Sequence, residues 1–216
     1  MKDMKLAFKL LKYSYQVKLN LGATTLVAVA ALGILGIHVI WGANSLFITY
    51  ATYLVLLAAT LPAQNLTCYV MTSFSATSPY QKRLQVVMPA MLNFLFMSAG
   101  YLVISFVCWS GFYFGKIQEG AASQIVFQTG IFGMIFAVYA ATSIKKYLLG
   151  TVMFILVVPA LLLNRLLIGI PFWTAVLLGE VLILLGAVIS RIVCELLYKS
   201  GVPRRIEAAW TKKLGC

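Results

Sequence analysis

The acidic residues and the single histidine are the groups of this chain that could bind a metal ion or transfer a proton. No two acidic residues are spaced to form a metal-binding or acid–base pair within one helix, and His38 stands apart from them. Zinc-protease, serine-hydrolase and P-loop motifs are absent from the sequence. We therefore expect no catalytic residues, no metal site, no cofactor and no ATP bound in the P-loop manner. The acidic residues are Asp3, Glu119, Glu180, Glu195 and Glu207.

The cysteines give no sign of redox or metal chemistry. They are scattered along the chain, and none forms a CxxC pair of the kind found in zinc sites and redox motifs. We expect them to be small packing residues. They are Cys68, Cys108, Cys194 and Cys216.

The composition indicates a membrane protein. Of the 216 residues, 62% are hydrophobic and only 10% are charged, whereas about a quarter of a soluble domain is charged. A net charge of +12 would suggest nucleic-acid binding in a soluble protein. Here the cations flank apolar segments, so we expect a lipid bilayer and no nucleic acid as the partner.

Six apolar stretches are long enough to cross the bilayer, since about 20 residues of helix span its hydrocarbon core. They predict an all-α, polytopic domain over residues 19–197. Two of them carry small residues at helical spacing that would allow close helix packing, namely Gly133, Ala137 and Ala141 in one and Gly186 and Ser190 in the other. The predicted spans are 19–40, 45–68, 86–114, 125–143, 147–167 and 172–197.

The cations predict the orientation. With an even number of spans, all 17 lysines and arginines except Lys116 and Arg165 fall on one side, which the positive-inside rule makes cytoplasmic. Trp41, Trp109 and Trp173 fall at the opposite ends of their spans, as expected for indole rings at the membrane interface. We therefore expect both termini in the cytoplasm of a multi-pass cell-membrane protein, with residues 198–216 as a basic cytoplasmic tail.

Residues 1–18 predict an amphipathic helix in the inner interface, and we expect no cleavable signal sequence there. Apolar residues such as Phe8 recur on one helical face and lysines on another, so the helix would lie with its apolar face in lipid. The alternative is a charged leader in solvent. The lysines of the predicted helix are Lys2, Lys5, Lys9 and Lys12.

Helix-start signals occur between the second and third spans. Ser78 is a good N-cap, Pro79 suits the first helical position, and Gln81 completes a capping box. A helix over residues 78–114 would be about 55 Å long, whereas the hydrocarbon core is about 30 Å thick. The excess has to project into the cytoplasm or bend, and Pro89 offers a bend point.

The start of this long helix is suited to binding a partner, because Tyr80 precedes the cations Lys82 and Arg83. The alternative is an ordinary inner loop whose cations only satisfy the positive-inside rule.

Six spans preceded by an amphipathic helix resemble the membrane (permease) subunit of a type 2 ABC exporter. In that family the loop between spans 2 and 3 often carries a Leu-Pro-x-Ser/Thr-Arg/Lys-type stretch before a long third helix. The stretch Ser78-Pro79-Tyr80-Gln81-Lys82-Arg83 is similar to it. One difference is the short connection of residues 168–171 between spans 5 and 6, where many members have a larger extracellular element.

The resemblance implies several partners and roles. Residues 78–83 would form the coupling helix that docks on a separate ATPase subunit, and residues 1–18 would be the elbow helix. Two permease subunits, identical or homologous, would assemble, and an amphiphilic substrate such as a peptide, lipid or drug would leave the cell.

Polar residues inside the spans are candidates for a translocation path. Glu180 lies about two turns inside the outer end of its span, where a charge costs about 2.5–3.5 kcal/mol, so it should face protein or water. It could belong to a transport path or a proton-coupled site, or it could be a protonated or hydrogen-bonded structural residue near Arg165. Gln64 and Asn65 could line a cavity or hold helices together. Arg191 and Glu195 are spaced to pair on one helix.

Two other functions fit the same residues. One is an ion-coupled secondary transporter or channel that uses Glu180. The other is a non-transporting membrane scaffold, or an immunity protein that sequesters a toxin in the membrane.

Overall fold

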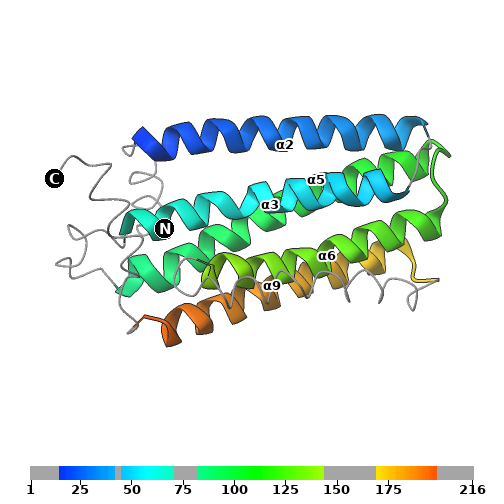
Figure 1. The fold of residues 1–216 in the computed structure, drawn as a ribbon. Helices are drawn as coiled ribbons and strands as arrows, with labels where there is room; N and C mark the ends of the chain where they lie inside the picture. The colour runs from blue at the N-terminus through cyan, green and yellow to red at the C-terminus, as the bar shows by residue number, and fades with distance from the viewer. Residues whose placement is uncertain (1–14, 42–44, 71–81, 144–168, 199–216) are drawn as a thin grey trace.

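The computed structural model describes residues 15–41, 45–70, 82–143 and 169–198, which form long helices lying side by side (Figure 1). Within these ranges there is no strand, so the all-α prediction is confirmed for the described part of the chain. The elements are α2 (Tyr15–Trp41), α3 (Ser45–Val70), the π-helical turn η1 (Arg83–Val87), α5 (Met88–Tyr113), α6 (Glu119–Thr142) and α9 (Phe172–Leu196).

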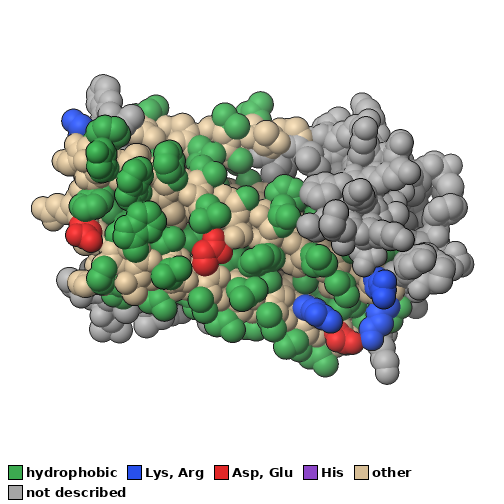
Figure 2. All heavy atoms as spheres, turned by 180° about the vertical axis from the view of Figure 1, so that it is seen from behind, with side chains coloured by type: hydrophobic (Ala, Val, Ile, Leu, Met, Phe, Trp, Pro, Cys, Tyr) green, Lys and Arg blue, Asp and Glu red, His purple; other side chains and the backbone are tan. Residues whose placement is uncertain are grey.

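Three of these helical stretches are long and apolar enough to cross a membrane: Arg83–Tyr113, Glu119–Thr142 and Phe172–Leu196. The described side chains of α2 and α3 add the shorter apolar stretches Thr25–Ile37 and Ile48–Gln64. Large apolar side chains also point outward, and one face is covered by many of them (Figure 2). A soluble monomer rarely exposes so much contiguous apolar surface. The protein is therefore a helical membrane protein.

The described helices coincide with five of the six predicted spans, and their starts differ in two places. The helix α2 begins at Tyr15 and α6 begins at Glu119, although the apolar runs predicted starts at residues 19 and 125. The first turn of α6 is polar and carries Glu119, which suits the positive end of the helix dipole but breaks the apolar pattern. The predicted span 147–167, residues 1–14 of the interfacial helix and nearly all of the tail lie outside the described residues.

Helices α6 and α9 are parallel neighbours. Gly130 lies against Gly179, Gly133 against Ile183, and Ala137 against Gly186, so the residue numbers rise together along the two helices. The backbone amide of Phe172, at the start of α9, lies 3.5 Å from a carboxylate oxygen of Glu119, at the start of α6.

Small residues allow the close approach of α6 and α9. A Cβ atom added to Gly186 would come within 2.7 Å of the Met134 backbone, and one added to Gly133 would come equally close to Ile183. Glycine has no side chain and therefore lets the two backbones approach this closely. Dispersion between closely packed helices is a main source of helix association in lipid. The predicted role of Gly133, Ala137 and Gly186 in helix packing is confirmed.

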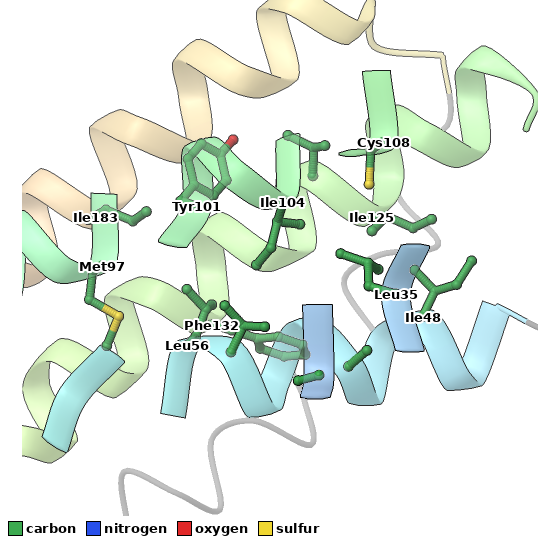
Figure 3. Close-up of a cluster of buried hydrophobic side chains, with 14 of the residues drawn as sticks. Leu35, Ile48, Leu56, Met97, Tyr101, Ile104, Cys108, Ile125, Phe132 and Ile183 are labelled. Carbon is green, nitrogen blue, oxygen red and sulfur yellow. The ribbon is translucent and has the colours of Figure 1, made fainter. Parts of the chain in front are cut away.

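The core lies where α2, α3, α5, α6 and α9 meet (Figure 3). Tyr101 of α5 is fully buried there, and its ring points toward α9. Met97, Ile104 and Cys108 continue the buried face of α5 at helical spacing. Cys108 and Cys194 are buried, as expected for packing residues.

The predicted bend point at Pro89 coincides with an irregular turn. The π-helical turn η1 comes directly before α5, and Pro89 lies in the first turn of α5. Proline has no amide hydrogen to donate to the preceding turn, and its ring crowds the carbonyl four residues earlier. A wider π-turn relieves that crowding, because its hydrogen bonds run to the fifth residue instead.

Candidate functional site

Glu180 and Ser98 form a polar pair between α9 and α5. The Ser98 hydroxyl donates to the Glu180 carboxylate, with its Oγ atom 2.9 and 2.8 Å from the two oxygens. A hydroxyl has one hydrogen to donate, so the two short contacts share it. The pair leaves the carboxylate with further capacity to accept hydrogen bonds or to bind a cation.

The carboxylate lies in an apolar surface about two turns from the start of α9. Its side chain is half-buried, while Leu177 and Val181 beside it are 69% and 53% exposed. The face drawn in Figure 2 is mostly hydrophobic and has few acidic side chains among the described residues. An ionisable group at such a position is expensive in lipid and is a functional candidate for that reason.

Tyr101 fixes the spacing of α5 and α9 next to this pair. Its hydroxyl lies 3.2 Å from the carbonyl oxygen of Ala175 and 3.1 Å from that of Val176, and it donates to them. Gly179 accommodates the ring, because a Cβ atom at that position would overlap the Tyr101 hydroxyl. Tyr101 and Gly179 therefore hold Ser98 and Glu180 in register.

A cavity of about 230 Å³ lies between α5 and α9 toward the start of α9, and we call this cavity together with the Glu180–Ser98 pair the α5–α9 groove. Trp109 and Trp173, both predicted at the membrane interface, belong to its lining. The buried Ser105 hydroxyl also lines it and has no hydrogen-bond partner among the described residues. The remaining lining residues are Leu102, Phe106, Phe172 and Val176.

At the other end of the bundle, Lys82 forms an ion pair with Glu195. The Lys82 Nζ atom lies 2.8 Å from a Glu195 oxygen, and the two side chains are 62% and 54% exposed. The hydrogen bond to the Glu195 carboxylate raises the pKa of Lys82 above its ordinary value. The sequence predicted that Glu195 would pair with Arg191 on the same helix. In the structure its ion pair is with Lys82 and joins two elements distant in sequence.

The predicted coupling residues are only partly described. Lys82 and Arg83 are exposed at the start of the helical stretch Arg83–Tyr113, which joins η1 to α5, while Ser78, Pro79, Tyr80 and Gln81 lie outside the described residues. The residues predicted for the interfacial helix, Lys2, Lys5, Phe8, Lys9 and Lys12, lie outside them as well.

Gln64 holds helices together at the same end as Lys82. Its side-chain amide donates to the Ser143 hydroxyl over 3.2 Å, which joins α3 to the end of α6. Gln64 was predicted either to line a cavity or to hold helices together, and this hydrogen bond favours the second role. Asn65 lies in α3, and its side chain is not among those described. A second cavity, of about 270 Å³, lies between α2, α3 and α5 and includes Pro62 in its lining.

Sequence reasoning missed the polar residues of α5. Asn93 is buried and donates to the Ala137 carbonyl oxygen over 2.9 Å, and Ser98, Tyr101 and Ser105 face α9. The spacing of residues 98, 101 and 105 was the available signal, because positions i, i+3 and i+7 share one helical face.

Among the described residues no group of three or more histidine, cysteine or acidic side chains could hold a metal ion. No protein-family description, curated protein or solved structure is significantly similar to this chain.

Proposed function

We propose that this chain is the membrane (permease) subunit of an ATP-driven ABC exporter. ATP would be hydrolysed on a separate ATPase chain, and the permease would move an amphiphilic substrate out of the cell. Its place would be the cell membrane, with a second permease subunit, identical or homologous, completing the transporter.

The observation that carries the proposal is the length of the third helix and the cations at its start. The helical stretch Arg83–Tyr113 has 31 residues, or about 45 Å at roughly 1.5 Å per residue, whereas the hydrocarbon core is about 30 Å thick. Its first turns therefore extend beyond the lipid with Lys82 and Arg83 exposed, as a docking element for an ATPase requires.

The order of the helices favours six spans. Two parallel neighbours such as α6 and α9 need an antiparallel return between them, and the predicted span 147–167 would supply it. The described cations favour cytoplasmic termini. Lys82 meets Glu195 at one end of the bundle, while Lys116 is exposed in the turn that joins α5 to α6 at the other.

The Lys82–Glu195 ion pair offers a route from the ATPase to the membrane interior. It joins the start of the long helix to the end of α9, and α9 carries Glu180 four turns further toward the opposite face. A rigid-body movement imposed on Lys82 and Arg83 by the ATPase would therefore move α9 relative to α6, along a seam of small residues that allows sliding.

The test is purification of the full chain from native membranes in mild detergent, with identification of any bound P-loop ATPase and measurement of its ATP hydrolysis. We expect a stoichiometric ATPase with the wild type and its loss with the variant Tyr80→Ala, Lys82→Glu and Arg83→Glu. The matched control is Lys116→Glu, a charge reversal at the opposite end, which should retain the ATPase.

Two outcomes of this experiment matter. Absence of any ATPase from the wild-type preparation overturns the exporter proposal. Retention of the ATPase by the triple variant overturns the assignment of the coupling residues. The double exchange Lys82→Glu with Glu195→Lys keeps an ion pair but reverses the exposed charge at residue 82, so it separates docking from helix pairing.

The Glu180–Ser98 pair favours a second candidate, an ion-coupled transporter. A half-buried carboxylate with a hydroxyl partner is the kind of group that binds and releases a proton or cation within a membrane. Transport by the reconstituted chain alone, driven by an ion gradient without ATP and abolished by Glu180→Gln, would establish it. Transport that requires ATP and the ATPase would exclude it.

A further inference from the structure

We propose that the α5–α9 groove is the binding site for an amphiphilic monocation, with its apolar part in the aromatic cavity and its charge at Glu180. This inference deepens the proposed function, because it names the substrate class that such a permease would recognise. Binding itself needs no ATPase, so it can be tested separately.

The position of Glu180 relative to the cavity supports this arrangement. Val176 lines the cavity, and Glu180 follows it by one helical turn on the same face of α9. On α5, Leu102 lines the cavity, and Ser98 precedes it by one turn. Residues one turn apart on a helix have Cβ atoms about 5–6 Å apart. A molecule in the cavity can therefore reach the Glu180 carboxylate with a short polar extension.

The cavity lining is suited to a cation with an aromatic or alkyl part. Trp109, Trp173, Phe106 and Phe172 all contribute to it, and the faces of such rings attract cations while their area binds apolar groups. The volume of about 230 Å³ exceeds the roughly 150 Å³ that suffices for benzene in an engineered cavity. The buried Ser105 hydroxyl offers a hydrogen bond to a polar atom of the ligand.

Charge complementarity decides the class of ligand. Glu180 is the one charged side chain of α9 between the start of the helix and Arg191, and its described polar contact is with the neutral Ser98. An anionic ligand would be repelled, and a neutral ligand would leave the carboxylate without a counter-charge from the described residues, in an apolar surface. A zwitterionic lipid headgroup would bring a phosphate beside the carboxylate. A monocation satisfies the site without these penalties.

N-benzylpyridinium is a suitable probe because it quenches tryptophan fluorescence and has a neutral isostere, diphenylmethane. The protein would be the full-length chain in a non-ionic maltoside detergent. The substitutions Trp41→Phe and Trp210→Phe would leave only the two cavity tryptophans to report binding. We expect N-benzylpyridinium to quench the tryptophan fluorescence saturably. Diphenylmethane and phosphatidylcholine should displace it only weakly.

Single substitutions then test separately whether the Glu180 charge and the cavity contribute to ligand binding. Glu180→Gln should weaken N-benzylpyridinium binding by at least about tenfold, because a desolvated charge pair is lost. The matched control on the same helix, Glu195→Gln, should leave binding unchanged. Val176→Phe should reduce binding of both the cation and the neutral isostere by filling the cavity. Size-exclusion elution and circular dichroism would verify that each variant is folded.

The result that overturns the proposal is non-saturable quenching, or equal affinity for the cation in wild type and Glu180→Gln. Tighter binding of the neutral isostere than of the cation, or full displacement by phosphatidylcholine, would also overturn it. Failure to recover an ATPase with the wild-type chain counts against the exporter and leaves these binding results unaffected, so the two proposals fail separately.

Discussion

Gly130 of α6 and Gly179 of α9 meet backbone to backbone, and no side chain separates the two helices at that point. On its other side Gly179 contacts the ring of Tyr101 from α5. One glycine thus sets the spacing of three helices, close to the Glu180–Ser98 pair.

We expect Gly179→Ala to destabilise the protein by about 1–3 kcal/mol, the usual range for an overpacked core. The added methyl group would overlap the Tyr101 hydroxyl and ring, which cannot move away without separating α5 from α9. The measurement is thermal unfolding in detergent, followed by retention of a monodisperse elution peak. Gly33→Ala in α2 is the control, because a Cβ atom added there meets nothing within 4 Å. We expect this variant to raise the free energy of unfolding by about 0.5–1 kcal/mol, because alanine favours the helix more than glycine does. Equal stability of the two variants would contradict the close approach of α6 and α9.

Asn93 provides a second prediction about the interior. Its amide donates to the Ala137 carbonyl oxygen, while its own carbonyl oxygen is buried without a partner among the described residues. Asn93→Leu should change the free energy of unfolding by less than about 1 kcal/mol, since hydrogen bonds between membrane helices contribute about 0.6 kcal/mol on average. Asn93→Ala should cost about 2 kcal/mol or more, because it leaves a cavity as well. Chemical unfolding of both variants in mixed micelles measures the difference. Equal losses of about 2 kcal/mol or more in the two variants would mean that the hydrogen bond, which both lack, dominates over the cavity.

The helices themselves could be predicted from the sequence, but their pairings could not. Long apolar runs locate α5 and α9 well. Glu180 was recognised as a candidate functional residue because a charge inside the bilayer is energetically costly. Apolar side chains surround most of both helices, however, so hydrophobic periodicity alone does not indicate which face of α5 turns toward α9, and only the spacing of its few polar residues does. Leu102 is exposed and Tyr101 is buried, although both are large and mostly apolar. The partner of Glu180 was missed for that reason, and the partner of Glu195 was sought on its own helix instead of at Lys82.

The Lys82–Glu195 pair leads to a prediction about pH. Hydrogen bonding to Glu195 raises the pKa of Lys82, so the folded state binds the lysine proton more tightly than the unfolded state does. The resulting stabilisation is fully present below the ordinary lysine pKa and is lost as the pH rises through the raised value. Between about pH 6 and about pH 9 the pair should therefore add no slope to the stability. Wild type and Lys82→Gln, compared by thermal unfolding across that range, should show parallel curves. Curves that converge at about pH 8 would mean that Lys82 titrates far lower than its environment implies.

Cysteine labelling provides a direct test of the orientation. In a background without the four native cysteines, Lys116→Cys should react with a membrane-impermeant maleimide in intact cells, because Lys116 is exposed in the turn between α5 and α6 and is predicted outside. Arg83→Cys, exposed at the opposite end, should react only after the membrane is opened. Cys108, restored singly, should react slowly in both conditions, because its side chain is buried in the core and burial excludes the reagent. Labelling of Arg83→Cys in intact cells, together with protection of Lys116→Cys, would reverse the orientation and place the exposed cations of the long helix out of reach of any cytoplasmic ATPase.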